Sequence, residues 1–396
     1  MNTEPKKSRL LFLDNIKLLF AILVIFNHAR VTYEGSGWWY YIAVINESHQ
    51  TDLLSAIFFQ ILASLGGIFQ ASLLGLFFLM GGFLTPKSYD RKEVRSFWKE
   101  RLFRLGIPII LYVVLINPIM FYMLSILGIK PWSDQILEGS FVDYYLSQFK
   151  TLEKSIDFLT TTGPMWFILV LLIFTFAYTL WRQITKYEPL QKYIPKELSI
   201  PRNFYLLLLS IILGCIAFIV RLGFPLDRFP LGLPFAYMIQ YLMMFCVGII
   251  AIRYNWFEQM TKEHIKVWSV IITTTVVLFF LYFFVAIGLD SDYSVVYGGP
   301  NFHALVFALV DNIICMGMIF VLIPIFKIRF NYQGRFQQKL SASAFHMYLI
   351  HAPILVIISL IFASISLFAL VKLAIVFPLT VVVCYLASHY VIQKIL

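Results

Sequence analysis

The stretch LDNIKLLFAILVIFNHARVTY, from Leu13 to Tyr33, decides the fold class because it is long and apolar enough to cross a lipid bilayer. Lys17 and His28 nevertheless lie inside the stretch, and Asp14 lies at its edge. An ionisable side chain within a membrane span is costly and needs a partner or a function. The stretch therefore predicts a membrane protein and raises the question of what these three residues do.

The composition of the whole chain also indicates a membrane protein. Of its 396 residues, 60% are hydrophobic and 13% are charged, and the mean hydropathy is +0.82. Soluble domains carry about 25% charged residues, so a water-soluble fold of this size cannot bury so much apolar surface. The first apolar run is too long, and too polar at its end, for a cleaved signal peptide, and we interpret it as the first membrane span.

Apolar runs of sufficient length recur along the chain, since a helix needs about 20 such residues to cross a bilayer. The sequence predicts an all-α, polytopic membrane helix bundle of about ten transmembrane helices, with a single integral membrane domain over residues 1–396. The ten predicted spans are 11–32, 53–84, 105–128, 165–181, 204–222, 233–252, 268–288, 302–325, 342–366 and 368–391.

The distribution of Lys and Arg predicts the orientation of the bundle, because cytoplasmic segments are enriched in these residues. With both termini in the cytoplasm, the inner segments hold 23 of the 31 basic residues and the outer segments hold seven, while Lys17 lies within a span. We therefore expect a cytoplasmic N-terminus and C-terminus, a cytoplasmic amphipathic segment at 85–104 and a long extracytoplasmic loop at 129–164. The net charge of +10 then reflects topology and gives no reason to expect a nucleic-acid partner.

Asp14, Lys17 and His28 form one polar stripe on the first predicted helix, since they fall within an arc of about 60° at 100° per residue. His28 lies about 16 Å beyond Lys17, toward the outer side. In one interpretation Asp14 and Lys17 form an ion pair at i,i+3 spacing and His28 is a structural residue. In the other, His28 is a general base, since an ordinary histidine pKa of about 6.5 suits proton transfer near neutral pH.

Lys17 and His28, with ten residues between them, resemble the basic-x10-His signature of the acyltransferase 3 family, multi-pass bacterial membrane proteins that acylate cell-surface sugars. Many members have Arg where this chain has Lys17, which shares the charge but lacks the bidentate fork. Five segments in order also resemble family signatures: LDNIK, FFLMGGFLTPK, RLFR, GPMWFILVLLIF and SASAFHMYLIHAPIL. The likeness covers nearly the whole chain, and the later segments look most like the glucans biosynthesis protein C branch, which resembles a succinyl-transferring group.

The resemblance implies an acyl-CoA-dependent membrane O-acyltransferase in the cytoplasmic (inner) membrane of a bacterial cell envelope. An acyl group, acetyl or in some members succinyl, leaves coenzyme A on the inner side. A hydroxyl of a carbohydrate accepts the group on the outer side, as in polysaccharide O-acetylation. His28 is then the general base. Lys17, positioned by Asp14, stabilises the polar channel at its cytoplasmic end and contacts coenzyme A. The implied partners are acyl-CoA, a carbohydrate acceptor and membrane lipids, and neither the glycan nor the oligomeric state follows from the sequence.

Arg101 and Arg104 are the candidates for binding the phosphates of acyl-CoA, because they share a helix face near the inner boundary and Arg matches phosphate through paired N–H donors. The alternative is that they anchor the helix by snorkelling to the lipid headgroups.

Tyr348 and His351 share a face of the ninth span and are further candidates for catalysis, with Tyr348 stabilising the oxyanion. His351 lies at a depth similar to that of Asp311, and a contact between the two is one hypothesis. The alternative is that His351 bonds a backbone carbonyl and joins helices.

Aromatic residues at the outer ends of the spans are the candidates for binding the sugar. Trp38 and Trp39 follow His28 closely, and Trp166 opens the fourth span. Interfacial Trp residues are also common as membrane anchors, which is the alternative for all three. The four cysteines lie in apolar runs and no Cys and His set has metal-ligand spacing, so we expect no metal site.

Two other functions compete with acyl transfer. A multi-pass transporter would use Lys17, Asp311 and His351 as a substrate or proton path, although transporters are often built from internal repeats and none is visible here. A subunit of a polysaccharide-export complex would bind without chemistry and would tolerate substitution of His28. The order of the motifs favours the acyltransferase.

Overall fold

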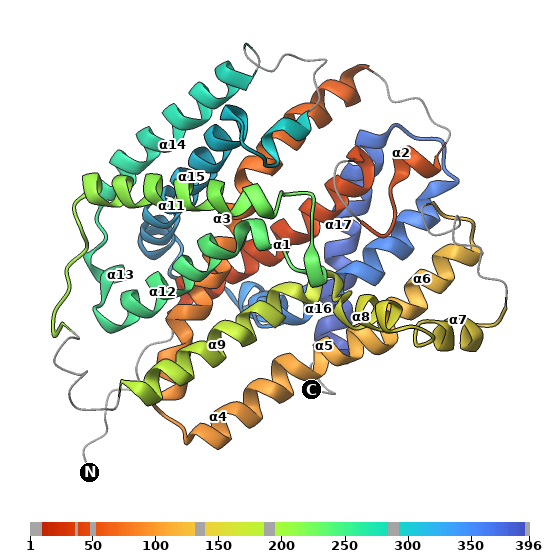
Figure 1. The fold of residues 1–396 in the computed structure, drawn as a ribbon, viewed down its shortest axis with the longest axis horizontal. Helices are drawn as coiled ribbons and strands as arrows, with labels where there is room; N and C mark the ends of the chain where they lie inside the picture. Colours follow the sequence, from red (N-terminus) through yellow and green to blue (C-terminus); the bar gives the residue numbers. More distant parts are fainter. Residues whose placement is uncertain are drawn as a thin grey trace.

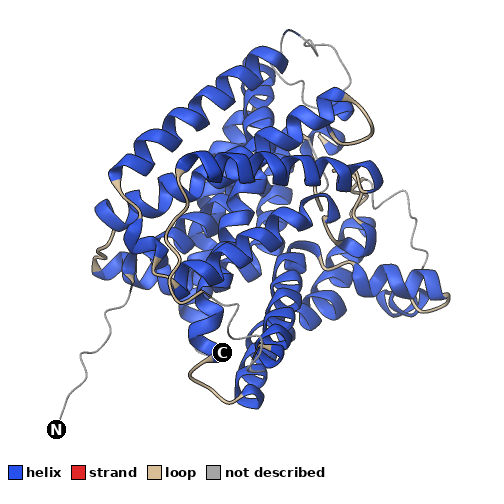
Figure 2. Cartoon of the chain, turned by 60° about the vertical axis from the view of Figure 1, so that its left-hand side comes forward, coloured by secondary structure: helices blue, strands red, loops and turns tan. Residues whose placement is uncertain are grey.

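The structure, a computed structural model, describes residues 10–35, 39–47, 53–130, 139–185, 195–283, 285 and 293–392. This part of the chain consists of helices and their connections and contains no strand (Figure 2). Ten of its helical segments are long and apolar enough to cross a membrane. The prediction of an all-α bundle with ten spans is therefore confirmed.

Nine of the ten spans are formed by a single long helix, some with a short continuation, close to the predicted positions. These helices are α1 (Leu11–Glu34), α3 (Leu53–Tyr89), α9 (Trp166–Ile184), α11 (Asn203–Gly223), α12 (Met238–Arg253), α14 (Lys262–Tyr282), α15 (Phe302–Arg329), α16 (Arg335–Ala363) and α17 (Ala369–Ala387). The third span is continuous through α4 (Val94–Arg101), η1 (Leu102–Gly106), α5 (Ile107–Leu111), η2 (Tyr112–Ile116) and α6 (Asn117–Ile126).

The third span begins at residue 94, earlier than the predicted residue 105, so the predicted amphipathic segment 85–104 is divided between the end of α3 and the start of this span. Two wider, π-helical turns interrupt the span at η1 and η2, and Pro108 and Pro118 follow them. A proline has no N–H to donate, and its ring clashes with the carbonyl four residues earlier, which lies in the π-helical turn each time. The wider turns accommodate the prolines, and Arg104 lies in the first of them.

Helix α3 packs against α12 at very short range near the middle of the bundle (Figure 1). A Cβ atom added to Gly82 would lie 2.0 Å from the carbonyl oxygen of Phe245, and one added to Gly248 would lie 2.0 Å from the carbonyl oxygen of Leu79. Small residues let two backbones approach in this way. Helix α3 also packs against α1, which in turn packs against α16 and α17.

Because the number of spans is even, the two ends of the chain lie on the same face of the bundle. We call this face the termini side and the opposite face the far side. Figure 1 shows α2 (Ala43–Asn46) at the opposite end of α1 from the N-terminus. The far side also carries α7 (Phe141–Ser147) and α8 (Leu152–Thr160), which lead into α9.

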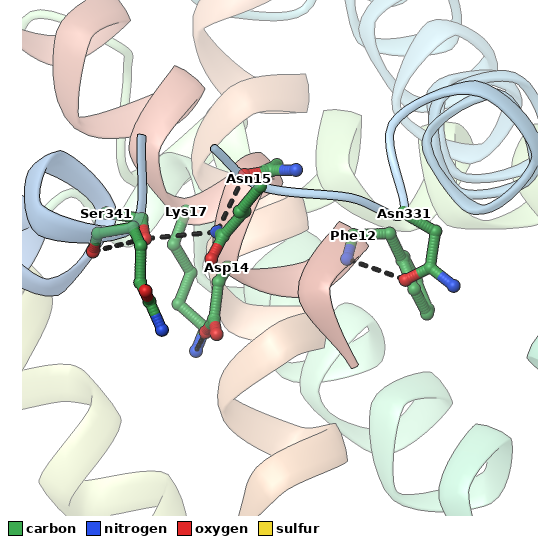
Figure 3. Close-up of polar contacts among 8 residues, drawn as sticks. Phe12, Asp14, Asn15, Lys17, Asn331 and Ser341 are labelled. Atoms are coloured by element: carbon green, nitrogen blue, oxygen red, sulfur yellow. Dashed lines mark hydrogen bonds and ion pairs between the residues drawn. The ribbon is translucent and has the colours of Figure 1, made fainter. Parts of the chain in front are cut away.

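Asn15 joins the start of α1 to the loop between α15 and α16 on the termini side (Figure 3). Its Nδ2 donates to the carbonyl oxygens of Phe330 and Tyr332 at 2.7 and 3.0 Å. Its Oδ1 accepts from the Nε2 atoms of Gln333 and Gln337 at 2.8 and 3.0 Å. The side chain is buried, so these four hydrogen bonds replace those it would make with water.

We expect Asn15→Ala to lower the apparent Tm of the purified protein in detergent by several degrees. The substitution removes hydrogen bonds to two partly buried carbonyl groups, and a typical hydrogen bond contributes about 0.5–1.5 kcal/mol to stability. The control is Lys17→Gln, which breaks a partly exposed ion pair worth less than about 1 kcal/mol. Equal thermal stability of Asn15→Ala and wild type would show that other contacts hold the loop.

Candidate active site

Two histidines lie close together in the interior of the bundle. His28 comes from α1 and His351 from α16, and their ring centroids are 5.2 Å apart with an interplanar angle of 22°. The indole of Trp39 stacks on His28 with ring centroids 3.9 Å apart and an angle of 15°. An aromatic face stabilises a nearby cation, so this indole favours the imidazolium that forms when His28 accepts a proton. The structure thus brings three of the predicted site residues into one cluster.

The hydrogen bond of His351 determines which of its nitrogens carries the proton. Nδ1 lies 2.5 Å from the carbonyl oxygen of Tyr348, and a carbonyl can only accept, so Nδ1 is the donor. Nε2 of the neutral ring then has a free lone pair, and it is buried without a hydrogen-bond partner among the described residues. This contact agrees with the alternative in which His351 bonds a backbone carbonyl. It also leaves Nε2 of His351 as a basic nitrogen beside His28.

A cavity of about 70 Å³ opens beside His28. Its wall includes Asn27 and His28 from α1, Pro164 and Trp166 at the start of α9, and Tyr348 from α16, together with apolar side chains of α1 and α3. The volume exceeds what a single water molecule requires. The cavity can therefore hold the reacting groups of a substrate next to the imidazole.

Tyr348 and Trp166 both line this cavity, but the hydroxyl of Tyr348 is already engaged. It donates a hydrogen bond to the carbonyl oxygen of Pro164. Trp166 stacks on Tyr241 of α12 with ring centroids 5.9 Å apart. In this arrangement Tyr348 holds the start of α9, and its proton is not directed at a substrate oxyanion as the sequence analysis expects.

Asn27 is a cavity residue that the sequence analysis does not single out. Its Oδ1 accepts from Nη2 and Nε of Arg30 at 3.1 and 3.4 Å, and the guanidinium also forms an ion pair with Glu34. Arg30 is buried, and a Cβ atom added to Gly66 of α3 would lie 2.7 Å from its guanidinium carbon. The signal in the sequence is the pair of polar residues on either side of His28 in IFNHAR, since both lie in an otherwise apolar run.

A buried ion pair anchors the segment 39–47, which carries Trp39 and covers the histidines. Nζ of Lys372 in α17 lies 2.5 Å from Oε2 of Glu47, and both side chains are buried. The hydroxyl of Tyr41 donates to Oε1 of the same carboxylate at 2.9 Å. Lys372 therefore holds the covering segment to the bundle.

Tyr40 attaches the same segment to the third span. Its hydroxyl donates to Oδ1 of Asn117 at 2.5 Å, and Nδ2 of Asn117 donates to the carbonyl oxygen of Thr161 at 2.5 Å. Burial raises the pKa of Tyr40 above its usual range, so this hydroxyl stays protonated and remains a donor. The bonds connect the segment 39–47 to the backbone that leads into the cavity wall at Pro164.

The predicted polar group on the termini side of α1 is an ion pair. Nζ of Lys17 lies 2.9 Å from Oδ1 of Asp14, and Figure 3 shows the two side chains together. Lys17 remains about one-third exposed, so a ligand can still reach the ammonium group. Its neighbour Leu18 packs against Ala344 of α16, which places the pair beside the first half of α16.

Arg101 and Arg104 lie in different surroundings, although they are three residues apart. The guanidinium of Arg101 lies over the ring of Phe97 at 5.3 Å and reaches Oγ1 of Thr85 at 3.5 Å. Arg104 is exposed, and its guanidinium lies over the ring of Phe345 in α16 at 5.4 Å. Arg104 therefore lies beside Phe345 of α16, and Leu18, the neighbour of Lys17, packs against Ala344 of the same helix.

The hypothesis of a contact between His351 and Asp311 is wrong. Oδ2 of Asp311 lies 2.5 Å from Nη2 of Arg221, and Oδ1 accepts from Nδ2 of Asn312 at 2.7 Å. Both members of the ion pair are buried, so Arg221 is part of the interior. Counting residues from the ends of the spans puts Asp311 and His351 at a similar depth in the membrane. The partner of Asp311 nevertheless comes from α11.

The structure places most of the predicted site residues in two groups. His28, His351, Tyr348, Trp39 and Trp166 surround the cavity or stack beside it. The second group, on the termini side, consists of Asp14, Lys17, Arg101 and Arg104. Trp38 lies outside the described residues.

A comparison with known protein families gives one match. The family model described as an acyltransferase domain, of the acyltransferase 3 type, matches residues 10–389, which is nearly the whole chain. No curated protein and no solved structure matches the chain.

We expect Lys372→Met to lower the thermal stability of the protein sharply. It leaves the Glu47 carboxylate buried without a counter-charge, at a cost of about 3–5 kcal/mol. The double variant Lys372→Met/Glu47→Gln removes that charge and should recover much of the lost Tm. A double variant as unstable as Lys372→Met alone would contradict the assignment of this ion pair as the anchor.

Proposed function

The chain belongs to the acyltransferase 3 family, and on this premise we propose that it is an acyl-CoA-dependent O-acyltransferase that modifies a carbohydrate hydroxyl across the membrane. The observation that carries the proposal is the position of His28, whose imidazole lines the cavity and stacks on Trp39. A histidine at such a site can act as a general base at neutral pH.

The termini side is proposed to be cytoplasmic, so that the far side faces outward. The bias of Lys and Arg toward the termini side supports this orientation. Three of the seven basic residues expected outside, Arg30, Arg221 and Lys372, are buried in ion pairs. The exposed positive charge is therefore even more concentrated on the termini side than the sequence count suggests.

In the proposed reaction, the acyl thioester and the acceptor hydroxyl meet in the cavity. His28 accepts the hydroxyl proton as the oxygen attacks the thioester carbonyl carbon, and a tetrahedral oxyanion forms. The oxyanion collapses to the ester and the C–S bond breaks. The coenzyme A thiolate takes the proton from His28, which returns the imidazole to its neutral form.

The donor is proposed to enter at the termini side, where Arg104 lies beside Phe345 of α16 and Leu18, next to Lys17, packs against Ala344. His351 is six residues further along that helix, which is about 9 Å, and His28 is about 16 Å from Lys17 along α1. Guanidinium and ammonium groups bind phosphates, so these residues suit the nucleotide end of coenzyme A. An extended acyl-pantetheine arm along α1 and α16 would then bring the thioester to the cavity.

Acetyl is the proposed acyl group, with succinyl as the alternative that the resemblance to the glucans biosynthesis branch suggests. The proposed location is the cytoplasmic membrane of a bacterial cell. The transporter alternative relies on a path through Lys17, Asp311 and His351. Contacts of the described residues do not support that path, because Asp311 pairs with Arg221 and Lys17 pairs with Asp14.

We expect His28→Ala to abolish acyl transfer while the protein still binds coenzyme A. Loss of a general base typically costs a factor of about 10²–10⁴ in rate. The measurement is release of coenzyme A and formation of acylated glycan in liposomes supplied with acetyl-CoA or succinyl-CoA and a panel of short glycans. The control His303→Ala removes a histidine that bonds Tyr282 away from the cavity. Normal turnover by His28→Ala would make His28 structural, with His351 the next candidate base.

We expect Arg104→Ala to raise the KM for acyl-CoA about tenfold with little change in kcat, since a charge-assisted hydrogen bond contributes about 1.5–3 kcal/mol to binding. The matched control is Arg95→Ala, an exposed arginine in the first turn of the same span. If both variants retain the wild-type KM, Arg104 is a helix anchor at the membrane surface.

A further inference from the structure

The amide of Asn27 can be oriented in only one way in this structure. An asparagine side chain has an accepting oxygen at one corner and a donating nitrogen at the other. The guanidinium of Arg30 contains only donors, so the corner of Asn27 that faces it must be Oδ1. Nδ2 therefore carries its two hydrogens away from Arg30.

Arg30 is held in place by two further contacts, so the amide of Asn27 does not rotate by 180°. Its Nη1 forms an ion pair with Glu34 one turn further along α1, and both side chains are buried. The guanidinium also rests on Gly66 of α3, where any side chain would collide with it. The pair of Arg30 and Glu34 thus acts as a fixed support for the direction of Asn27.

Asn27 and His28 line the same cavity from adjacent positions of α1. The hydroxyl of Tyr348, which also lines the wall, gives its hydrogen to the carbonyl oxygen of Pro164. We propose that Asn27 is a catalytic residue whose Nδ2 donates to the thioester carbonyl oxygen and stabilises the oxyanion that forms there. Arg30 is then a positioning residue, which acts through Asn27. The inference rests on the proposed acyl transfer and adds a named donor to it.

The proposed step conserves atoms and charge. While His28 takes the proton of the acceptor hydroxyl, the carbonyl oxygen gains the negative charge and the N–H of Asn27 donates to it more strongly. When the C–S bond breaks, the carbonyl re-forms and the hydrogen bond weakens, so Asn27 neither gains nor loses a proton. A donor fixed before reaction and placed away from bulk water is the kind of group that favours a transition state over a ground state.

The test replaces the donor without changing the shape of the side chain. Asn27→Asp keeps an oxygen for Arg30 and removes the N–H groups, and we expect kcat for acyl transfer to fall about 10²–10³-fold with little change in the KM for acetyl-CoA. Asn27→Ala, without any added charge, should show a similar loss. We expect Tyr348→Phe to reduce kcat by less than tenfold. The matched control Asn203→Asp keeps the acceptor for Nε1 of Trp268 and should retain wild-type turnover.

A second measurement reports the hydrogen bond directly and needs no turnover. Isotope-edited infrared spectra of bound acetyl-CoA, labelled with ¹³C at the thioester carbonyl, should show a higher carbonyl frequency in Asn27→Asp than in wild type. Equal frequencies, or wild-type kcat in both Asn27 variants, would overturn the role of Asn27 while the proposed function stands. A wild-type protein that binds neither acetyl-CoA nor succinyl-CoA would overturn the proposed function and this inference with it.

Discussion

The structure depends on one constraint: a charged group inside the bilayer must find its partner within the protein, because lipid offers none. Among the described residues, three ion pairs have both side chains buried: Arg30–Glu34, Arg221–Asp311 and Lys372–Glu47. All three lie in the half of the bundle nearer the far side, the half that also contains the histidine cluster. Separating such a pair leaves an uncompensated buried charge, so Arg221–Asp311 fixes α11 to α15 and Lys372–Glu47 fixes α17 to the segment 39–47, while Arg30–Glu34 lies within α1. One of these pairs reaches the cavity wall, because Arg30 also donates to Asn27.

The features that could be predicted from the sequence are those that depend on one segment at a time. The length and apolarity of a run predict a span, and helical periodicity places Asp14, Lys17 and His28 on one stripe without any knowledge of the neighbouring helices. The Asp14–Lys17 ion pair follows from the same local geometry. The early start of the third span was harder to foresee, because the first turns of that helix are polar and resemble a surface segment until Phe97 is seen to be buried.

The contacts between distant segments could not be predicted, because a single sequence does not tell which helices are neighbours. His28 and His351 lie 323 positions apart in the chain, and Lys372 finds its partner Glu47 across 325 positions. Depth estimates gave Asp311 and His351 the same level, yet Asp311 faces Arg221 on a different helix. The orientation of the Asn27 amide could not be predicted either, since it depends on the guanidinium of Arg30, which packs on Gly66 of another helix.

In the proposed acyl transfer, hydrolysis of the thioester would compete with attack by the sugar hydroxyl, so the site would have to exclude water. In the segment that follows α1, the side chains of Trp39, Tyr40 and Tyr41 are all buried, and Trp39 stacks on His28. The same segment is bound to α17 through Lys372 and to the third span through Asn117, so two separate parts of the bundle hold it in place. The cavity of about 70 Å³ beside His28 has room for the reacting groups. His28, the proposed base, and Trp39, which stacks on it, are only eleven positions apart in the sequence, so one short stretch of chain would supply both the base and the aromatic residue that covers it.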